Sequence, residues 1–395
     1  MKRNDLIFCL IAAACIAISY IATDIYLPAL PTLRMFFSVN IETIQTTVSI
    51  YMIGVVIAQL IIGPVADHYG FRQTIIPLAI LLILTSLFCA SARSVLMLDI
   101  GRLLQALAAG GMAVIGRASF SRYFPPDRAM SLYIAIIPPV AIISPALAPS
   151  IGGLLAHHFN WQSIFILLAL LSLLVLLGLI FNYPVGKQEN VETSLRPSFI
   201  VKTYLGLLIH RDLLAFLSIT MAIFAVYYAY MIESPFIFHA QGYSVKQIGF
   251  SYISIGLAFL LTTQTTRLLL KYFPFMAILN VGFSLTTLGI LALLLLSFIT
   301  RLSMLSILIP VTFYMGAIGF LGPIAMSKSI ALFPTKSGYA SSLIGSSSLL
   351  GAALGAQLVH LITNGSVRNL AILSLVIIIM AWLLFYVLIK PTSAK

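Results

Sequence analysis

The sequence predicts an all-α integral membrane protein with twelve transmembrane helices in two pseudo-symmetric bundles of six. Of the 395 residues, 61% are apolar and only 8% are charged, whereas soluble domains have roughly 45–50% and about 25%. The apolar residues fall into runs close to the length of about 20 residues that crosses a bilayer. The two sets of six runs also echo one another, and Leu6 and Leu213 open corresponding spans.

The first six spans are separated by charged or turn-forming breaks. The N-terminal run has the basic start and small residues of a secretory signal. Because it continues to Asp24 and further spans follow, we expect an uncleaved first span. The six spans are predicted near 6–27, 45–66, 74–92, 95–118, 131–156 and 163–183.

A polar link from Tyr183 to Arg211 precedes the second set. Its later part, 199–209, has the composition of an amphipathic helix lying on the inner membrane surface. The predicted organisation is therefore an N-terminal bundle over 1–185, a cytoplasmic linker over 186–211 and a C-terminal bundle over 212–395. The second six spans are predicted near 212–233, 247–268, 275–299, 303–327, 338–362 and 370–389.

Positive charge predicts the orientation of these spans. The formal net charge is +12, yet the 22 Lys and Arg residues are scattered between apolar runs, so a nucleic-acid partner is not expected. With the N-terminus inside, most of them fall in cytoplasmic segments, as the positive-inside rule requires. The predicted outer loops hold only Arg34, Arg93, Lys246, Arg301 and Arg368. We therefore expect a multi-pass protein of the cell inner membrane with both termini in the cytoplasm.

Two charged residues inside predicted spans indicate a functional site. Asp24 lies in the stretch YIATDIYLPALP of the first span, and Arg102 lies about two turns into the fourth. A charge in hydrocarbon costs at least about 2.5–3.5 kcal/mol on the insertion scale, so a partner or a hydrated cavity is expected. Residue counting places both side chains in the outer half of the bilayer. We expect Asp24 to gain and lose a proton as its hydration changes.

Other acidic residues leave alternatives open. Asp99 precedes Arg102 by three residues and could form a local ion pair along one helix face. Asp24 could instead pair with Arg102 only to hold the first and fourth spans together. Glu233, near the predicted outer end of the seventh span, is either an exposed interfacial carboxylate or a second site for a proton or a cationic substrate.

The sequence offers no catalytic or metal-binding pattern. The six histidines do not share a helix at the spacing of metal ligands, and no nucleophile elbow or phosphate-binding loop is present. We therefore expect no enzyme activity, no metal and no cofactor apart from protons as the coupling ion. Aromatic and amide side chains are the candidates for substrate contact, although most membrane aromatics are packing or interfacial residues. They are Tyr20, Tyr51, Gln105, Phe224, Tyr227 and Tyr228.

The stretch GPVADHYGFRQT, between the second and third spans, carries Gly63, Asp67, Gly70 and Arg72. Glycines permit a tight turn there, and an acid at a helix end can pair locally or cap a neighbouring helix. The pattern G-x-x-x-D-x-x-G-x-R resembles the signature loop of the major facilitator superfamily. That resemblance implies a conformational latch, and we include Arg117, near the cytoplasmic end of the fourth span, among the gating candidates.

The fourth and fifth spans add to this resemblance. Arg102 and Gln105 are similar to the R-x-x-Q-G motif of the superfamily, with Ala106 at the last position. The fifth span resembles the antiporter motif associated with exporters, with Ser144 before its first proline. Prolines kink such helices, and small residues let neighbours pack closely. The motif residues are Pro145, Pro149, Gly152 and Gly153.

Three longer segments resemble the Bcr/CflA group of drug:proton antiporters within the superfamily. They are TDIYLPALP, APSIGGLLAHHFNWQSIF and YMIESPFIFHAQGYSVKQIGFSY. Two departures are Gln162 after Trp161, where the group commonly has Arg, and Glu233 before SPF, where a small residue is usual. The resemblance implies a monomeric, proton-coupled exporter of small amphipathic compounds that works by alternating access. Export of an endogenous metabolite or siderophore, and a non-transporting receptor or enzyme, are the alternatives.

Overall fold

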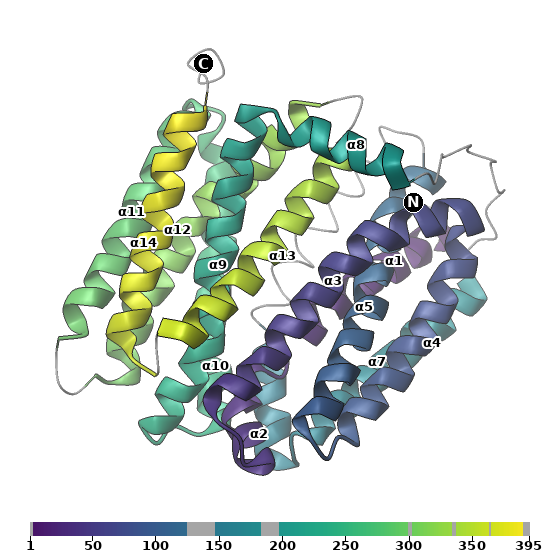
Figure 1. The fold of residues 1–395 in the computed structure, drawn as a ribbon, viewed down its shortest axis with the longest axis horizontal. Helices are drawn as coiled ribbons and strands as arrows, with labels where there is room; N and C mark the ends of the chain where they lie inside the picture. The colour runs from purple at the N-terminus through teal and green to yellow at the C-terminus, as the bar shows by residue number, and fades with distance from the viewer. Residues whose placement is uncertain are drawn as a thin grey trace. The chain divides into compact units, whose positions relative to one another are not determined.

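The computed structural model describes residues 3–124, 147–182, 197–298, 302–333, 337–362 and 365–389. These residues form helices joined by short connections (Figure 1). The chain divides into two compact units, Met1–Leu195 and Arg196–Lys395. Ten helices within the described ranges are long and apolar enough to cross a membrane. The predicted all-α membrane fold is confirmed.

The first unit begins with an interrupted span. Its first three helices, α1, η1 and α2, form one apolar stretch from Asp5 to Phe37. The predicted fifth span lies largely outside the described residues, and only 147–158 of it is seen, as a helix. The unit contains α1 (Arg3–Asp24), η1 (Leu27–Ala29), α2 (Leu30–Phe37), α3 (Ile41–Tyr69), α4 (Phe71–Ala90), α5 (Val95–Tyr123), the 147–158 helix and α7 (Gln162–Asn182).

The second unit begins with a short helix, α8, in the segment predicted to be amphipathic. On α8, Leu207 is buried in an apolar cluster with Leu213 and Ile344, whereas Leu205 is exposed. The unit contains α8 (Pro197–Leu208), α9 (Arg211–Ala240), α10 (Val245–Leu269), α11 (Phe275–Leu296), α12 (Met304–Ala331), α13 (Ser337–Ile362) and α14 (Val367–Leu388).

Polar caps set where several spans begin. The side chain of Asn40 accepts a hydrogen bond from the Thr43 N–H at 2.8 Å, and Ser94 and Ser366 cap α5 and α14 in the same way. Ser244 forms a reciprocal capping box with Gln247 at the start of α10. Such caps satisfy N–H groups that the first helical turn leaves unpaired.

The same packing pattern recurs within each unit. In the first unit α5 packs against both α1 and α3, and α4 packs against α7. In the second unit α12 packs against both α9 and α10, and α11 packs against α14. These helices correspond in their order along the predicted six-span repeats, so the internal layout of the units matches the predicted pseudo-symmetry.

Two helices run further than predicted. α3 continues through Gly63 and Pro64 to Tyr69, so only Gly70, with a φ of 95°, forms the turn that both glycines were expected to share. α9 continues through Pro235 to Ala240, because its residues stay buried up to Phe238. Glu233 therefore lies inside α9 rather than at its end.

Candidate functional site

The first span is interrupted beside Asp24. α1 ends at Asp24, and the residues after it form η1 and α2. Pro28 has no backbone N–H, so it cannot donate a hydrogen bond to the carbonyl of Asp24 four residues earlier. The end of α1 therefore presents carbonyl groups that need other donors. Asp24 itself is 1% exposed.

Arg102, on α5, reaches this end of α1. Its Nη1 donates to the carbonyl of Ala22 at 2.9 Å and to Oε1 of Gln105 at 2.7 Å. The guanidinium carbon lies 4.2 Å from the ring centre of Tyr26 and 3.9 Å from that of Tyr51. The partial negative charge of a helix C-terminus and the faces of aromatic rings both stabilise a buried cation. The guanidinium is fully buried.

A network of polar side chains extends from Arg102 across four helices. Nε2 of Gln105 donates to Oγ of Ser86 on α4 at 2.8 Å. The Tyr26 hydroxyl is 3.0 Å from that of Thr47 on α3, and the Tyr51 hydroxyl donates to the carbonyl of Ser19 at 3.3 Å. Satisfied polar networks of this kind fix the positions of their members in a low-dielectric interior. Arg102 is therefore held in one orientation beside the end of α1.

Part of the hydrogen-bonding capacity of Arg102 is not used by the residues that the structure describes. Within the described residues, its buried Nε and Nη2 atoms make no hydrogen bond. Leaving a buried donor unsatisfied costs about 1–3 kcal/mol, and more for a charged group. The site can therefore accept a further hydrogen-bond acceptor, such as an oxygen of a bound compound.

Asp99 makes no hydrogen bond to Arg102, although the two charges attract each other electrostatically. Oδ1 of Asp99 is buried and has no hydrogen-bond partner among the described residues, and the polar contacts of Arg102 go to Ala22 and Gln105 instead. The reason is geometric, because the guanidinium turns toward α1, where a helix end and two rings receive it. Asp24 is the acidic residue in the last turn of α1, the turn to which Arg102 donates.

The predicted antiporter-motif helix touches the same interruption of α1. A methyl group on Gly152 would overlap the carbonyl oxygen of Ile25, the residue after Asp24. Glycine is therefore required for the 147–158 helix to approach α1 so closely. Pro149 and Gly153 are buried in this helix, and Pro145 lies outside the described residues.

The predicted gating residues lie at one end of the first unit. Nη2 of Arg72 donates to the carbonyl of Ile180 at 2.9 Å, near the C-terminal end of α7, where a cation is favourable. Gly63 lies inside α3 and Gly70 forms the turn. Arg117 is half-buried on α5, and Asp67 is placed on the last turns of α3.

Glu233 lies in the second unit and is buried. It is 1% exposed, so the interpretation of an exposed interfacial carboxylate is wrong. Its Oε1 accepts a hydrogen bond from the backbone N–H of Gly365 at 2.5 Å. Gly365 has a φ of 78° and directly precedes Ser366, the cap of α14. The carboxylate thus binds the connection between α13 and α14.

The other candidate substrate residues are divided between the two units. Tyr51 and Gln105 contact Arg102, whereas Tyr20 packs against an apolar cluster of the first unit. Tyr227 and Tyr228 lie in the second unit with their ring centres 5.0 Å apart. Phe224 and Tyr227 are half-buried on α9, and Tyr228 is buried.

Sequence reasoning missed Tyr26 and Ser86 as members of the charged site. Both lie in apolar runs where Tyr and Ser are unremarkable, so their residue types carried little signal. For Tyr26 the signal was its position in the interrupted stretch, two residues after Asp24. For Ser86, no pattern along α4 indicates a partner on α5.

These observations define a helical multi-pass membrane protein with a buried charged site and a repeated six-span layout. Residues 12–356 match the Major Facilitator Superfamily, and the chain belongs to this family, whose members are membrane transporters rather than enzymes.

Two similar curated proteins are bacterial. The chain is 29% identical over 219 residues to YdgK of Bacillus subtilis strain 168, an uncharacterized MFS-type transporter, covering 54% of each chain. It is 30% identical over 205 residues to the multidrug resistance protein MdtL of Escherichia coli O157:H7, covering 49% of this chain and 52% of that one. The chain spans about half the length of the curated relatives it matches.

Solved structures resemble the fold over nearly its whole length. A D-xylose–proton symporter matches with a TM-score of 0.82 at 15% identity, covering 99% of both chains. A bacterial homologue of the human lysosomal transporter Spinster, inward-facing and occupied, matches with a TM-score of 0.77 at 14% identity, covering 100% of this chain and 99% of that one. At these identities the likeness shows the fold alone.

Proposed function

We propose that the protein is a proton-coupled exporter of small amphipathic compounds, a drug:proton antiporter of the Bcr/CflA type in the cell inner membrane. The observation that carries this proposal is the buried charged site of the first unit. Asp24 is nearly fully buried in the last turn of α1, the same turn to which Arg102 donates. Burying a carboxylate and a guanidinium this deep in apolar spans costs free energy, and such residues mark ion pathways and proton relays.

Export is supported by independent observations. The multidrug resistance protein MdtL shares 30% identity with the chain over the matched residues. Gly152 of the antiporter-like helix packs against the interruption of α1 beside Asp24, so the helix that resembles exporters contacts the proposed proton site. A proton-coupled importer with this arrangement would not be expected to carry the fifth-span motif.

In the proposed cycle, Asp24 takes up a proton when the site opens to the outside, which favours release of the compound. It loses the proton when the site opens to the cytoplasm, which favours binding. Each step removes or restores a negative charge at the end of α1, where Arg102 is already held. Arg102 therefore experiences a changed attraction toward α1 in each step, and this change links protonation to the packing of α1 against α5.

The remaining features of the proposal concern the whole chain. The bundles over 1–185 and 212–395 alternate access by rocking about the site, as in other transporters built from repeats, and 186–211 links them in the cytoplasm. Both termini are cytoplasmic, and the protein works as a monomer. Protons serve as the coupling ion without another cofactor.

The test uses the full-length protein reconstituted in lipid vesicles, with chloramphenicol among a panel of uncharged and cationic antibiotics. We expect Asp24→Asn to abolish transport driven by a proton gradient and to abolish proton release on substrate binding. Asp99→Asn is the matched control and should keep both, because Asp99 does not bond to Arg102. Undiminished proton-coupled transport by Asp24→Asn would contradict the proposal.

Export of an anionic metabolite or siderophore is a second candidate, and one observation favours it. The Nε and Nη2 atoms of Arg102, which bond to none of the described residues, have the planar geometry that binds carboxylates. A carboxylate-bearing compound would then require Arg102 specifically, so Arg102→Lys would lose its export while keeping that of uncharged drugs. Metabolite analysis of culture supernatants from a deletion strain, beside an antibiotic-susceptibility panel, distinguishes the two candidates.

A further inference from the structure

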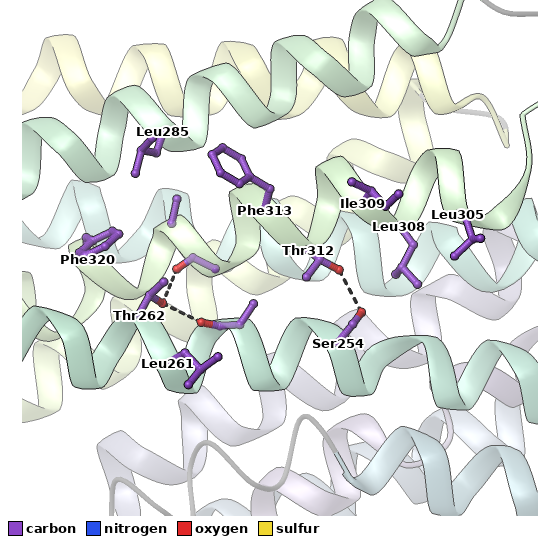
Figure 2. Close-up of a pocket in the computed structure, with 13 residues that line it drawn as sticks. Ser254, Leu261, Thr262, Leu285, Leu305, Leu308, Ile309, Thr312, Phe313 and Phe320 are labelled. Carbon is purple, nitrogen blue, oxygen red and sulfur yellow. Dashed lines mark hydrogen bonds between the residues drawn. The ribbon is translucent and has the colours of Figure 1, made fainter.

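In the second unit, α12 carries a long apolar groove on one of its exposed sides. α12 packs against both α10 and α11, and the groove runs over α12 between them, with side chains of all three helices lining it (Figure 2). Its volume is about 640 Å³. Leu261, Leu305 and Ile309 at its rim are 64%, 65% and 68% exposed. The groove therefore opens sideways along its length rather than into the interior of the unit.

Small residues shape the middle of this groove. A methyl group on Gly316 would stand 3.1 Å from the Cβ of Ala258, so α10 and α12 approach closely at this point. Gly316 and Ala258 are among the smallest residues of the lining, so they make a narrow slot in it. Larger apolar side chains, among them Phe313 and Leu261, line the rest of the groove (Figure 2). A slim chain fits such a slot better than a compact ring system does.

The polar side chains in the lining are already satisfied. The hydroxyls of Ser254 and Thr312 bond to each other at 2.9 Å, and the Thr262 hydroxyl donates to the carbonyl of Gly316 at 2.6 Å. The lining contains no charged residue. A polar ligand would lose its hydration there without gaining a free hydrogen-bond donor. The uncharged lining therefore matches a hydrocarbon occupant.

The length of the groove matches the membrane interior. The groove extends along α12 from Leu305 to Phe320, a rise of about 22 Å at about 1.5 Å per residue. The hydrocarbon core of a bilayer is about 30 Å thick. The groove therefore follows the spanning helices through most of that depth.

We infer that this groove is a binding site for one acyl chain of a phospholipid, which fills the slot over Gly316 and lies along α12. The occupant enters from the surrounding bilayer without passing through the protein. Because it contacts α10, α11 and α12 together, it stabilises the arrangement of these three helices. This inference is independent of the transported substrate, since it uses none of the residues of the charged site.

The test uses the full-length protein in nanodiscs that contain phosphatidylethanolamine with a photoactivatable diazirine in the middle of one acyl chain. After illumination, we expect mass spectrometry to find labels concentrated on 305–320 of α12 and 254–262 of α10. Labelling there should exceed, several-fold, that of exposed apolar side chains elsewhere, such as Leu170 and Leu174 of α7. Even labelling of all exposed apolar faces would show bulk lipid only and would overturn the inference.

A pair of substitutions sharpens the test. Ala258→Trp fills the slot and should remove the excess labelling, while Ala292→Trp, on an exposed position of α11 outside the groove, should leave it unchanged. If Ala258→Trp does not fold, Ala258→Leu should reduce the labelling partly. Equal labelling of the wild type and a folded Ala258 variant would contradict the site. Preferential labelling by a photoactivatable antibiotic instead of the phospholipid would replace the proposed occupant.

Discussion

Arg102 is held by groups that are neutral or only partly charged: a carbonyl at a helix end, an amide and two aromatic rings. In the proposed cycle none of these groups changes its charge, so they hold the cation while the charge of Asp24 varies. The proposed gain and loss of a proton by Asp24 therefore needs no release of Arg102 from these groups. The rings of Tyr26 and Tyr51 contact the guanidinium of Arg102 with their faces. A substitution that removes a ring face therefore tests whether this contact stabilises the cation.

Two substitutions of Tyr51 separate its ring from its hydroxyl. Tyr51→Phe keeps the face over Arg102 and loses the hydrogen bonds of the hydroxyl, among them the 3.3 Å bond to Ser19, so we expect nearly unchanged stability and transport. Tyr51→Leu removes the face, and a desolvated cation–π contact contributes about 2 kcal/mol, so its unfolding temperature in detergent and its transport should both fall. Equal behaviour of the two variants would show that the ring face does not stabilise Arg102.

The sequence predicted the charged members of the site better than the neutral ones. Asp24 and Arg102 could be found because an ionised group in hydrocarbon costs free energy and is therefore usually functional. Tyr26 and Ser86 could not, because neutral polar residues are common in spans and their partners lie on other helices. The burial of Glu233 was not predicted, since the seventh span was expected to end near residue 233.

At the scale of helices, the interruption of α1 is shaped by two residues that act through the backbone. Pro28 withholds a donor from the end of α1, and Gly152 lets the 147–158 helix approach the carbonyl of Ile25. In the second unit, Gly351 and Gly355 of α13 meet the carbonyls of Met221 and Ala225 on α9 in the same manner. The starts of spans were predictable from hydropathy, whereas these close contacts depend on packing between distant segments.

Gly152→Ala tests the contact beside Asp24. The added methyl group would overlap the carbonyl oxygen of Ile25, so the helices must separate, and overpacking of this kind costs about 1–3 kcal/mol. We expect a lower unfolding temperature and weaker proton-coupled transport.

Gly206→Ala is the matched control for this change. Nothing lies within 4 Å of the methyl group it would add, and alanine favours a helix over glycine by about 0.5–1 kcal/mol. Its stability should therefore rise slightly with transport unchanged. A Gly152→Ala variant as stable and active as the control would mean that the approach to α1 is not needed.

At the scale of the whole molecule, the two units share a layout but differ in their buried acids. The first unit places Asp24 beside a cation held by a polar network, whereas the second places Glu233 against the backbone N–H of Gly365. The two units therefore share a fold, but the surroundings of their buried acids differ. The sequence predicted the duplication and both acids, but their different surroundings depend on contacts between helices that no local pattern encodes.

Glu233→Gln tests whether the second unit contributes a proton site. Glutamine keeps an oxygen that can accept from Gly365, so the connection between α13 and α14 should remain in place while the titratable charge is lost. Because the Glu233 carboxylate already binds this connection, we expect transport with an unchanged number of protons per substrate, measured in vesicles from the reversal potential at set proton and substrate gradients. Glu233→Leu removes the acceptor and should lower the unfolding temperature, since the half-buried N–H of Gly365 would lose its partner. A Glu233→Gln variant that folds normally but moves fewer protons per substrate would instead show that Asp24 shares the coupling with Glu233.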